Sequence, residues 1–177
     1  MMNEERVNLI YDNPASKFRI LFKPLDNFDL YSAIVLPRGN CRFIDVLRKF
    51  KLRKMNAYLE SSEMKWVKLK LPKFKIMSQN NLNQVFKNYG VTDIFDRYHS
   101  DFGMMTNHSV FIENLIQFVR IDIDDDNLLA ADNKTKTVED AGQPYKFHVK
   151  GPFVFLVYSR SNKMVYISAI VTNPTAA

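Results

Sequence analysis

One stretch of the chain, Asp122-Ile-Asp-Asp-Asp-Asn127, gathers carboxylates at a spacing that could bind a cation. Its alternate aspartates fit the first, third and fifth positions of a calcium-binding loop. Asn127, however, stands where such a loop needs glycine, and Asn133 stands where it needs a bidentate glutamate. The pattern therefore favours solvated carboxylates at the end of a strand, and we expect no metal ligand.

Other residues able to do chemistry lack partners at a useful spacing. His99, His108 and His148 lack the spacing of metal ligands, and Cys41 is the only cysteine, so a zinc site is not predicted. No Ser-His-Asp arrangement and no glycine-rich phosphate loop is present, with 5 glycines in the chain. We expect neither enzymatic activity nor a cofactor.

Basic and aromatic residues interleave at Lys65-Trp-Val-Lys-Leu-Lys70, a pattern that could contact nucleic acid. A half-buried strand with one solvated face explains the same alternation. The net charge of +6 could favour acidic partners, but the lysines are scattered, as on an ordinary solvated surface. We expect no nucleic-acid partner.

The 177 residues suffice for a domain that buries roughly 70% of its unfolded surface. No apolar run is long enough for a membrane span, and the first residues lack the apolar core of a signal peptide. A single cysteine fits a reducing compartment. These features predict a cytoplasmic protein without membrane contact, secreted only if the native start lies upstream.

The elements that must position these residues follow from hydrophobic periodicity. Residues 1–17 read as a lead-in with at most one edge strand, and residues 18–177 as a single α+β domain. Alternation and β-branched content predict strands at 18–22, 30–36, 66–71, 72–76, 110–123 and 145–149. Apolar spacing predicts short helices at 43–50, 53–59 and 81–89, the last stopped by Gly90, and a turn or short helix at 91–95.

The C-terminal region predicts a β-hairpin. Phe153–Tyr158 and Met164–Val171 are β-rich runs on either side of a short polar turn. The first run is apolar on both faces, so we expect the hairpin to lie inside the protein.

Several short motifs, in this order, resemble those of the serpin family: Val35-Leu-Pro37, Leu71-Pro-Lys-Phe74, Tyr89-Gly-Val-Thr-Asp-Ile-Phe95, Ser100-Asp-Phe102, Gly151-Pro-Phe153 and Thr172-Asn-Pro174. Each motif is weak alone, but their order and spacing identify the chain as similar to serpins from Phe18 to Pro174. Ala169 departs from the family's usual glycine. The resemblance covers only the C-terminal half of a serpin. It implies a serpin-like half-fold of mixed and antiparallel sheets, a few short helices and a buried C-terminal hairpin.

The resemblance also implies a reactive loop, which we place at residues 124–144. An inhibitory serpin is cut in this loop, which then inserts as a strand into the large sheet. Insertion needs a hinge, typically Glu-Gly-Thr followed by small residues. The hinge-like positions here are Asp125, Asp126, Asn127, Leu128, Ala130 and Ala131.

Strand alternation makes insertion of this loop unfavourable. With Leu128 inward, the buried set would be Leu128, Ala130, Asp132, Lys134, Lys136 and Val138. Three of these are charged, so insertion would be opposed by on the order of 10 kcal/mol unless they found partners. A register shift of one residue would instead bury the uncharged residues Leu129, Ala131, Asn133, Thr135 and Thr137. The same shift would turn the neighbouring side chains of the strand to the opposite face.

The loop still has the length of protease bait. By the family's spacing, the cut falls near Asp140, Ala141 and Gly142, with Asp140 or Ala141 before the scissile bond. An aspartate there suits caspase-like or granzyme-B-like proteases, whose pockets pair a carboxylate with arginine. A solvated loop with an incidental Glu-Asp pair is the plainer interpretation.

Two hypotheses follow. The first is a non-inhibitory, serpin-like protein-binding module that self-associates or needs a protein partner, because half a serpin leaves sheet edges and apolar faces uncovered. The second is a serine or cysteine protease inhibitor that uses loop 124–144 as bait for a host protease. An Asn- and Lys-rich composition favours a viral or invertebrate source, which raises a role in host–virus interaction as a hypothesis.

Overall fold

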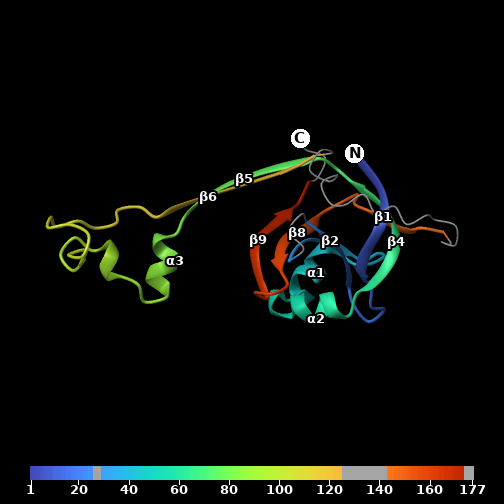
Figure 1. Ribbon diagram of the computed structural model, residues 1–177, viewed down its shortest axis with the longest axis horizontal. Coiled ribbons are helices and arrows are strands. Elements are labelled where there is room, and N and C mark those ends of the chain that lie inside the picture. Colours follow the sequence, from blue (N-terminus) through green and yellow to red (C-terminus); the bar gives the residue numbers. More distant parts are fainter. Residues whose placement is uncertain (26–28, 125–142, 174–177) are drawn as a thin grey trace. The chain divides into compact units, whose positions relative to one another are not determined.

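The computed structural model describes residues 1–25, 29–124 and 143–173, which fall into two compact units (Figure 1). The first unit is Met1–Phe74 with Ile123–Ala177, and the second is Lys75–Asp122. The expected division into a lead-in over residues 1–17 and a single domain over residues 18–177 stays a prediction. Nearly every side chain of the second unit is at least partly exposed.

A seven-stranded sheet, ordered β7-β4-β1-β2-β3-β8-β9, forms most of the first unit. Its neighbours pair antiparallel, except for the parallel pair β4 and β7. The strands are β1 (Met2–Tyr11), β2 (Phe18–Pro24), β3 (Leu30–Pro37), β4 (Glu63–Leu71), β7 (Tyr145–His148), β8 (Phe153–Ser159) and β9 (Met164–Val171). All of these except β1 were predicted as strands, with ends that differ by a few residues.

Strand β1 corrects the expectation of an edge strand in a lead-in. It pairs with β4 from Met2 to Ile10 and with β2 from Leu9 to Tyr11, so it lies between two strands. Its polar residues hid this role, because Asn3 and Glu5 occupy the exposed face while Met2 and Ile10 are buried on the other.

Short helices cover one face of the sheet at β2, β3 and β8. They are α1 (Phe43–Lys49), a 3₁₀ turn η1 (Leu52–Lys54) and α2 (Met55–Glu60), in agreement with the predicted periodicity. Val46, Met55 and Tyr58 from this segment pack with Phe18 and Leu156 of the sheet in one core cluster. The Tyr58 ring meets Phe18 edge-on, with the ring centroids 5.5 Å apart.

The C-terminal hairpin is buried in its first strand only. Every residue of β8 except Val157 is buried, because β3 and β9 pair on its two edges and other side chains cover both faces. Strand β9 is the last in the sheet and alternates, with Tyr166 and Ile170 exposed. The expectation of a fully internal hairpin was therefore wrong for β9.

The second unit is built on a two-stranded sheet of β5 (Phe74–Asn81) and β6 (Ile116–Ile123). Between them lie α3 (Asn83–Asn88) and a 3₁₀ turn, η2 (Asp93–Phe95). The strand predicted over 110–123 begins only at Ile116. Gly90 ends α3 as predicted, with a φ of +84° and hydrogen bonds from Gly90 N–H to Lys87 O and from Val91 N–H to Phe86 O.

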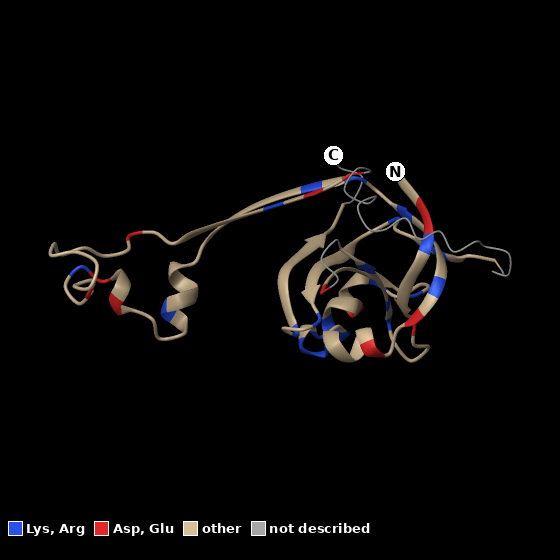
Figure 2. Ribbon diagram, in the orientation of Figure 1, with Lys and Arg blue, Asp and Glu red and all other residues tan. Residues whose placement is uncertain are grey.

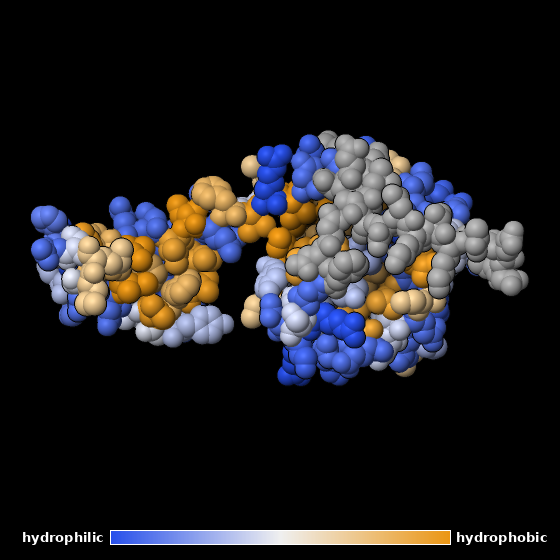
Figure 3. All heavy atoms as spheres, viewed as in Figure 1, coloured by the Kyte–Doolittle hydropathy of each residue, from blue (hydrophilic) through white to orange (hydrophobic). Residues whose placement is uncertain are grey.

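The second unit has almost no core. Ile121 is its only buried residue, and every position from 75 to 122 is described. Its exposed large hydrophobic side chains include Met77, Val85, Phe86, Tyr89, Tyr98, Met104, Met105, Phe111 and Phe118. Hydrophobic residues, orange in Figure 3, gather on the visible surface of this unit. Within the described part of the chain, no helix is long and apolar enough to cross a membrane.

Candidate functional site

The residues predicted to act as bait and hinge lie outside the described residues. These are Asp140, Ala141 and Gly142 for the bait, and Asp125, Asp126, Asn127, Leu128, Ala130 and Ala131 for the hinge. The described chain fixes only the two ends of this segment: β6 and Asp124 before it, and Gln143, Pro144 and β7 after it.

Strand β7, which follows the predicted loop, is tied to other segments of the first unit by a partly buried polar network. The Tyr145 hydroxyl donates to Asp12 Oδ2 over 2.6 Å, and Arg38 Nη2 lies 3.5 Å from Asp12 Oδ1. Burial, and then the hydrogen bond to Asp12, raises the pKa of Tyr145. The first residue of β7 is thereby anchored to the segment that follows β1.

Arg19 of β2 completes this network. Its Nη1 donates to the Tyr145 hydroxyl over 3.3 Å and to the Lys146 carbonyl over 3.1 Å. Its guanidinium also lies over the Phe147 ring, with Cζ 4.9 Å from the centroid. One arginine therefore contacts three successive residues of β7, which fixes the position of the strand after the loop.

The end of β6, before the predicted loop, forms ion pairs through Asp122. Asp122 Oδ2 lies 3.4 Å from Lys75 Nζ of β5 and 3.2 Å from Arg120 Nη2. Desolvation opposes ionisation of this carboxyl, but hydrogen bonds from Arg120 and Lys75 hold the pKa of Asp122 below its usual value. Asp122, the first position of the calcium pattern, is thus engaged by cationic side chains.

No group of three or more His, Cys, Asp or Glu side chains that could hold a metal ion occurs among residues 1–25, 29–124 and 143–173. Asp126, Asn127 and Asn133 of the calcium pattern lie outside these ranges. Cys41 is a half-buried free thiol.

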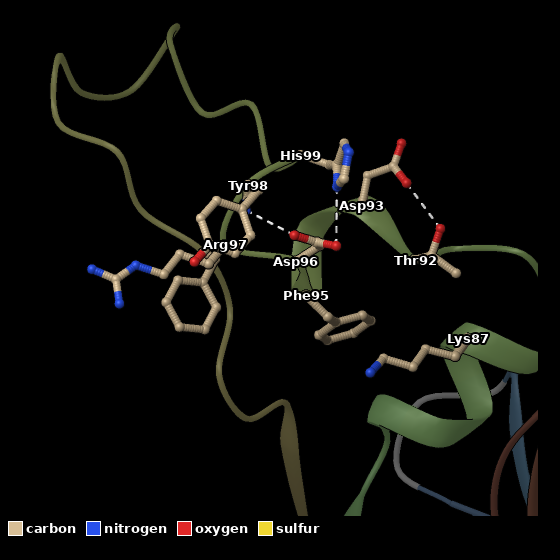
Figure 4. A pocket seen from close by; sticks show the side chains of 9 residues that line it. Lys87, Thr92, Asp93, Phe95, Asp96, Arg97, Tyr98 and His99 are labelled. Carbon is tan, nitrogen blue, oxygen red and sulfur yellow. Dashed lines mark hydrogen bonds and ion pairs between the residues drawn. The ribbon is translucent and has the colours of Figure 1, made fainter.

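An open hollow of about 710 Å³ lies within the second unit (Figure 4). His99 Nδ1 is 3.0 Å from Asp96 Oδ2 at its rim, and this hydrogen bond raises the pKa of His99. The Tyr98 backbone N–H, followed by His99, lowers the pKa of Asp96. Both side chains are well exposed, so the arrangement is a surface ion pair among the residues that line the hollow.

The outer face of β4 and β7 carries a row of cations. The parallel register pairs Lys68 with Lys146 and Lys70 with His148, so these four side chains share one face. Lys68 forms an ion pair with Glu5 of β1. Asn3, Glu4, Glu5, Lys68 and Lys70 line a hollow of about 360 Å³ beside this row. Lys68 and Lys70 of this row belong to the predicted basic strand, whereas Lys146 and His148 come from a distant part of the sequence.

Sequence reasoning missed the polar network around Tyr145. Its hydrogen bonds link residues separated by 126 and 133 positions, so no local spacing could reveal them. The pairing of Lys70 with His148 was missed for the same reason, since it depends on a parallel register between distant strands.

Comparison with known proteins gives a consistent result. The family model described as Serpin (serine protease inhibitor) matches residues 1–174. The match begins at residue 1, so the expectation that the likeness starts at Phe18 was wrong. The family pattern includes β1, whose polar exposed face had concealed it.

Relatives from an insect and a virus are similar over most of this chain. Serine protease inhibitor 88Ea of Drosophila melanogaster is 25% identical over 155 residues, which cover 85% of this chain and 36% of that protein. Serine proteinase inhibitor 2 of Myxoma virus (strain Uriarra) is 28% identical over 148 residues, which cover 81% of this chain and 43% of the viral protein.

Among solved structures, a serpin from the trematode Schistosoma haematobium superposes with a TM-score of 0.80 at 27% identity. The superposition covers 98% of this chain and 46% of the trematode protein. The chain therefore spans less than half the length of these serpins.

Proposed function

The chain belongs to the serpin family, and from that premise we propose that it is a non-inhibitory, protein-binding serpin that does not insert its loop. Proteins of this family are mostly protease inhibitors that act on protease partners. In this chain, the predicted partner is a second copy or another protein that covers the second unit.

The exposed apolar surface of the second unit carries this proposal. Ile121 is the only buried residue from 75 to 122, while Phe118 is 72% exposed and Met105 is 82% exposed. Apolar surface of this extent favours association, because burial of apolar area is the main driving force of protein–protein contact.

The strand arrangement around the loop supports a non-inhibitory role. Strand β6 leads into the predicted loop, and among the described strands it pairs with β5 alone. Insertion as the resemblance implies it would place the loop between two strands, so a second flanking strand would have to come from elsewhere. The charged residues Asp132, Lys134 and Lys136 oppose insertion further.

Cleavage of the 124–144 segment tests the proposal. We expect limited proteolysis there to change the thermal midpoint by no more than a few degrees, because the charged segment stays outside the sheet. A large rise after cleavage would show insertion and overturn the proposal. A variant with Asp132, Lys134 and Lys136 changed to Ala serves as comparison, since it removes the electrostatic barrier.

Sedimentation tests the association itself. We expect the unmodified chain to form dimers or larger assemblies as its concentration rises, and Phe118→Ala with Met105→Ala to weaken them. A well-behaved monomer at all concentrations, together with no binding of a hydrophobic dye to the second unit, would contradict the proposal.

The second candidate is a protease inhibitor that uses the loop as bait. The relatives named as serine protease inhibitors favour it. Incubation with serine proteases, granzyme B and caspases distinguishes the two functions. An SDS-stable adduct, or inhibition that Asp140→Ala abolishes, would establish the inhibitor; absence of both supports the binding protein.

A further inference from the structure

The outer face of β4 and β7 has an excess of positive charge that its own acidic residues do not balance. Glu5 pairs with Lys68, whereas Lys70, Lys146 and Lys150 have no acidic partner among the described residues. Lys146 and Lys150 are exposed and Lys70 is half-buried. The basic positions of the first unit are blue in Figure 2. This group, together with His148, is called the basic face below.

His148 is part of the basic face, and its pKa is lowered by burial and by the cations around it. Burial lowers the pKa of His148, and the positive charges of Lys70, Lys150, Lys146 and Arg19 lower it further. The buried His148 Nε2 has no hydrogen-bond partner among the described residues. The charged groups that act on this imidazole are Lys70 of β4, Lys146 and Lys150 of the β7 segment, and Arg19 of β2. Lys68 of β4 and Glu5 of β1 form their ion pair on the same face of the sheet.

The free edge of β7 is already occupied in part. Val149 N–H donates to the Lys70 carbonyl, so Val149 and Phe147 direct their backbone groups toward β4, and Lys146 directs its own away from it. On that outer side, Arg19 Nη1 donates a hydrogen bond to the Lys146 carbonyl. A partner strand added at this edge could not use that carbonyl as an acceptor. A partner that contacts the side chains of the face is therefore favoured over an added strand.

We propose that the basic face binds an acidic segment of a partner protein, whose carboxylates pair with Lys70, Lys146 and Lys150. Charge complementarity identifies this occupant, since cations without acidic partners on a sheet face attract carboxylates. Nucleic acid is the less favoured ligand. Trp66 is the only aromatic side chain that the register places on this face of β4 and β7, and it is half-buried, so the described face offers no row of rings for base stacking.

The inference rests on the proposed binding function, because it names the chemistry of a partner. It concerns a surface of the first unit alone. Failure here would leave the cleavage and sedimentation results unchanged, so the two proposals can fail separately.

The experiment uses the full chain and a short fluorescent peptide of alternating Glu and Ser, with binding followed by anisotropy. A triple variant, Lys70→Gln, Lys146→Gln and Lys150→Gln, is expected to weaken binding by about tenfold or more, because three ion pairs with the peptide are lost. The matched control changes the exposed Lys49, Lys51 and Lys54 to Gln, which removes the same charge elsewhere. Equal losses in both variants would overturn the proposal.

Three further arms sharpen the result. A peptide with Gln in place of Glu is expected to lose binding, and tighter binding of a single-stranded oligothymidylate than of the acidic peptide would overturn the proposal. Acidic-peptide binding is expected to tighten as the pH falls through the lowered pKa of His148, because a nearby carboxylate favours the charged imidazole. His148→Gln is expected to flatten this pH dependence, and an unchanged profile would count against a site at His148.

Discussion

The Tyr145 hydroxyl donates a hydrogen bond to the Asp12 carboxylate over 2.6 Å and so joins the strand after the predicted loop to the segment that follows β1. We expect Tyr145→Phe to lower the free energy of unfolding by about 1–2 kcal/mol, because the half-buried carboxylate loses a donor. Urea denaturation measures this. Tyr98→Phe is the control, since Tyr98 is 89% exposed, and a similar loss there would contradict the assignment.

The ion pair between Lys23 and Glu4 is the most buried of the described salt bridges, with Nζ and Oε2 2.8 Å apart. Burial lowers the pKa of Lys23 despite its hydrogen bond to Glu4. We expect Glu4→Gln to cost about 3 kcal/mol, because a buried cation loses its counter-charge. Glu5→Gln removes the neighbouring, more exposed pair with Lys68 and should cost below about 1 kcal/mol. Equal effects in chemical denaturation would contradict this difference.

Asp29 stabilises the turn between β8 and β9. Its Oδ1 accepts the Ser161 backbone N–H over 2.7 Å, and its side chain also accepts the Ser159 hydroxyl. The hydrogen bond from Ser159, followed by that from Ser161, lowers the pKa of Asp29 in the folded chain.

A lowered carboxyl pKa means that the folded state binds fewer protons than the unfolded state. The stability from Asp29 is therefore present above its unfolded pKa of about 3.8 and is lost as the pH falls through the folded value. Asp29→Asn should reduce the dependence of the urea midpoint on pH in this acidic range. A variant with the full acid dependence of the parent would exclude this role.

The two units should respond differently to loss of a large apolar side chain. Phe147 is fully buried in the first unit, so Phe147→Ala should cost about 3–5 kcal/mol through lost contacts and a cavity. Phe118 is 72% exposed in the second unit, so Phe118→Ala should change the stability of the isolated chain by less than about 0.5 kcal/mol. A large loss of monomer stability from Phe118→Ala would show that this unit has a core of its own.

The pKa values of His99 and His148 should depart from the ordinary histidine pKa in opposite directions. The hydrogen bond to Asp96 raises the pKa of His99, while burial and neighbouring cations lower that of His148. NMR titration should therefore show His99 losing its proton at higher pH than His148. The stability from the His99 pair is complete below about 6.5 and is lost as the pH rises through the folded pKa. Asp96→Asn should return His99 toward its ordinary pKa, and no change on this substitution would contradict the pairing.

Most strands and helices could be predicted because their apolar residues recur at a local period. The alternation in β4, the spacing in α1 and α2, and Gly90 after α3 each depend on residues a few positions apart. Strand β1 could not be placed in this way, because its polar face looks like a surface segment until β4 and β2 pair on its two sides.

The sequence by itself determined the order of the elements, the likeness to serpins and the charged character of the predicted loop, since all three are properties of neighbouring residues. Tertiary structure decided which distant groups meet: Arg19 with Tyr145, and Lys70 with His148. It also decided that β9 lies at an edge and that the second unit remains exposed. The physical reason is that burial and pairing depend on strand register and on which surfaces are covered, and neither is encoded in the spacing of residues along one segment.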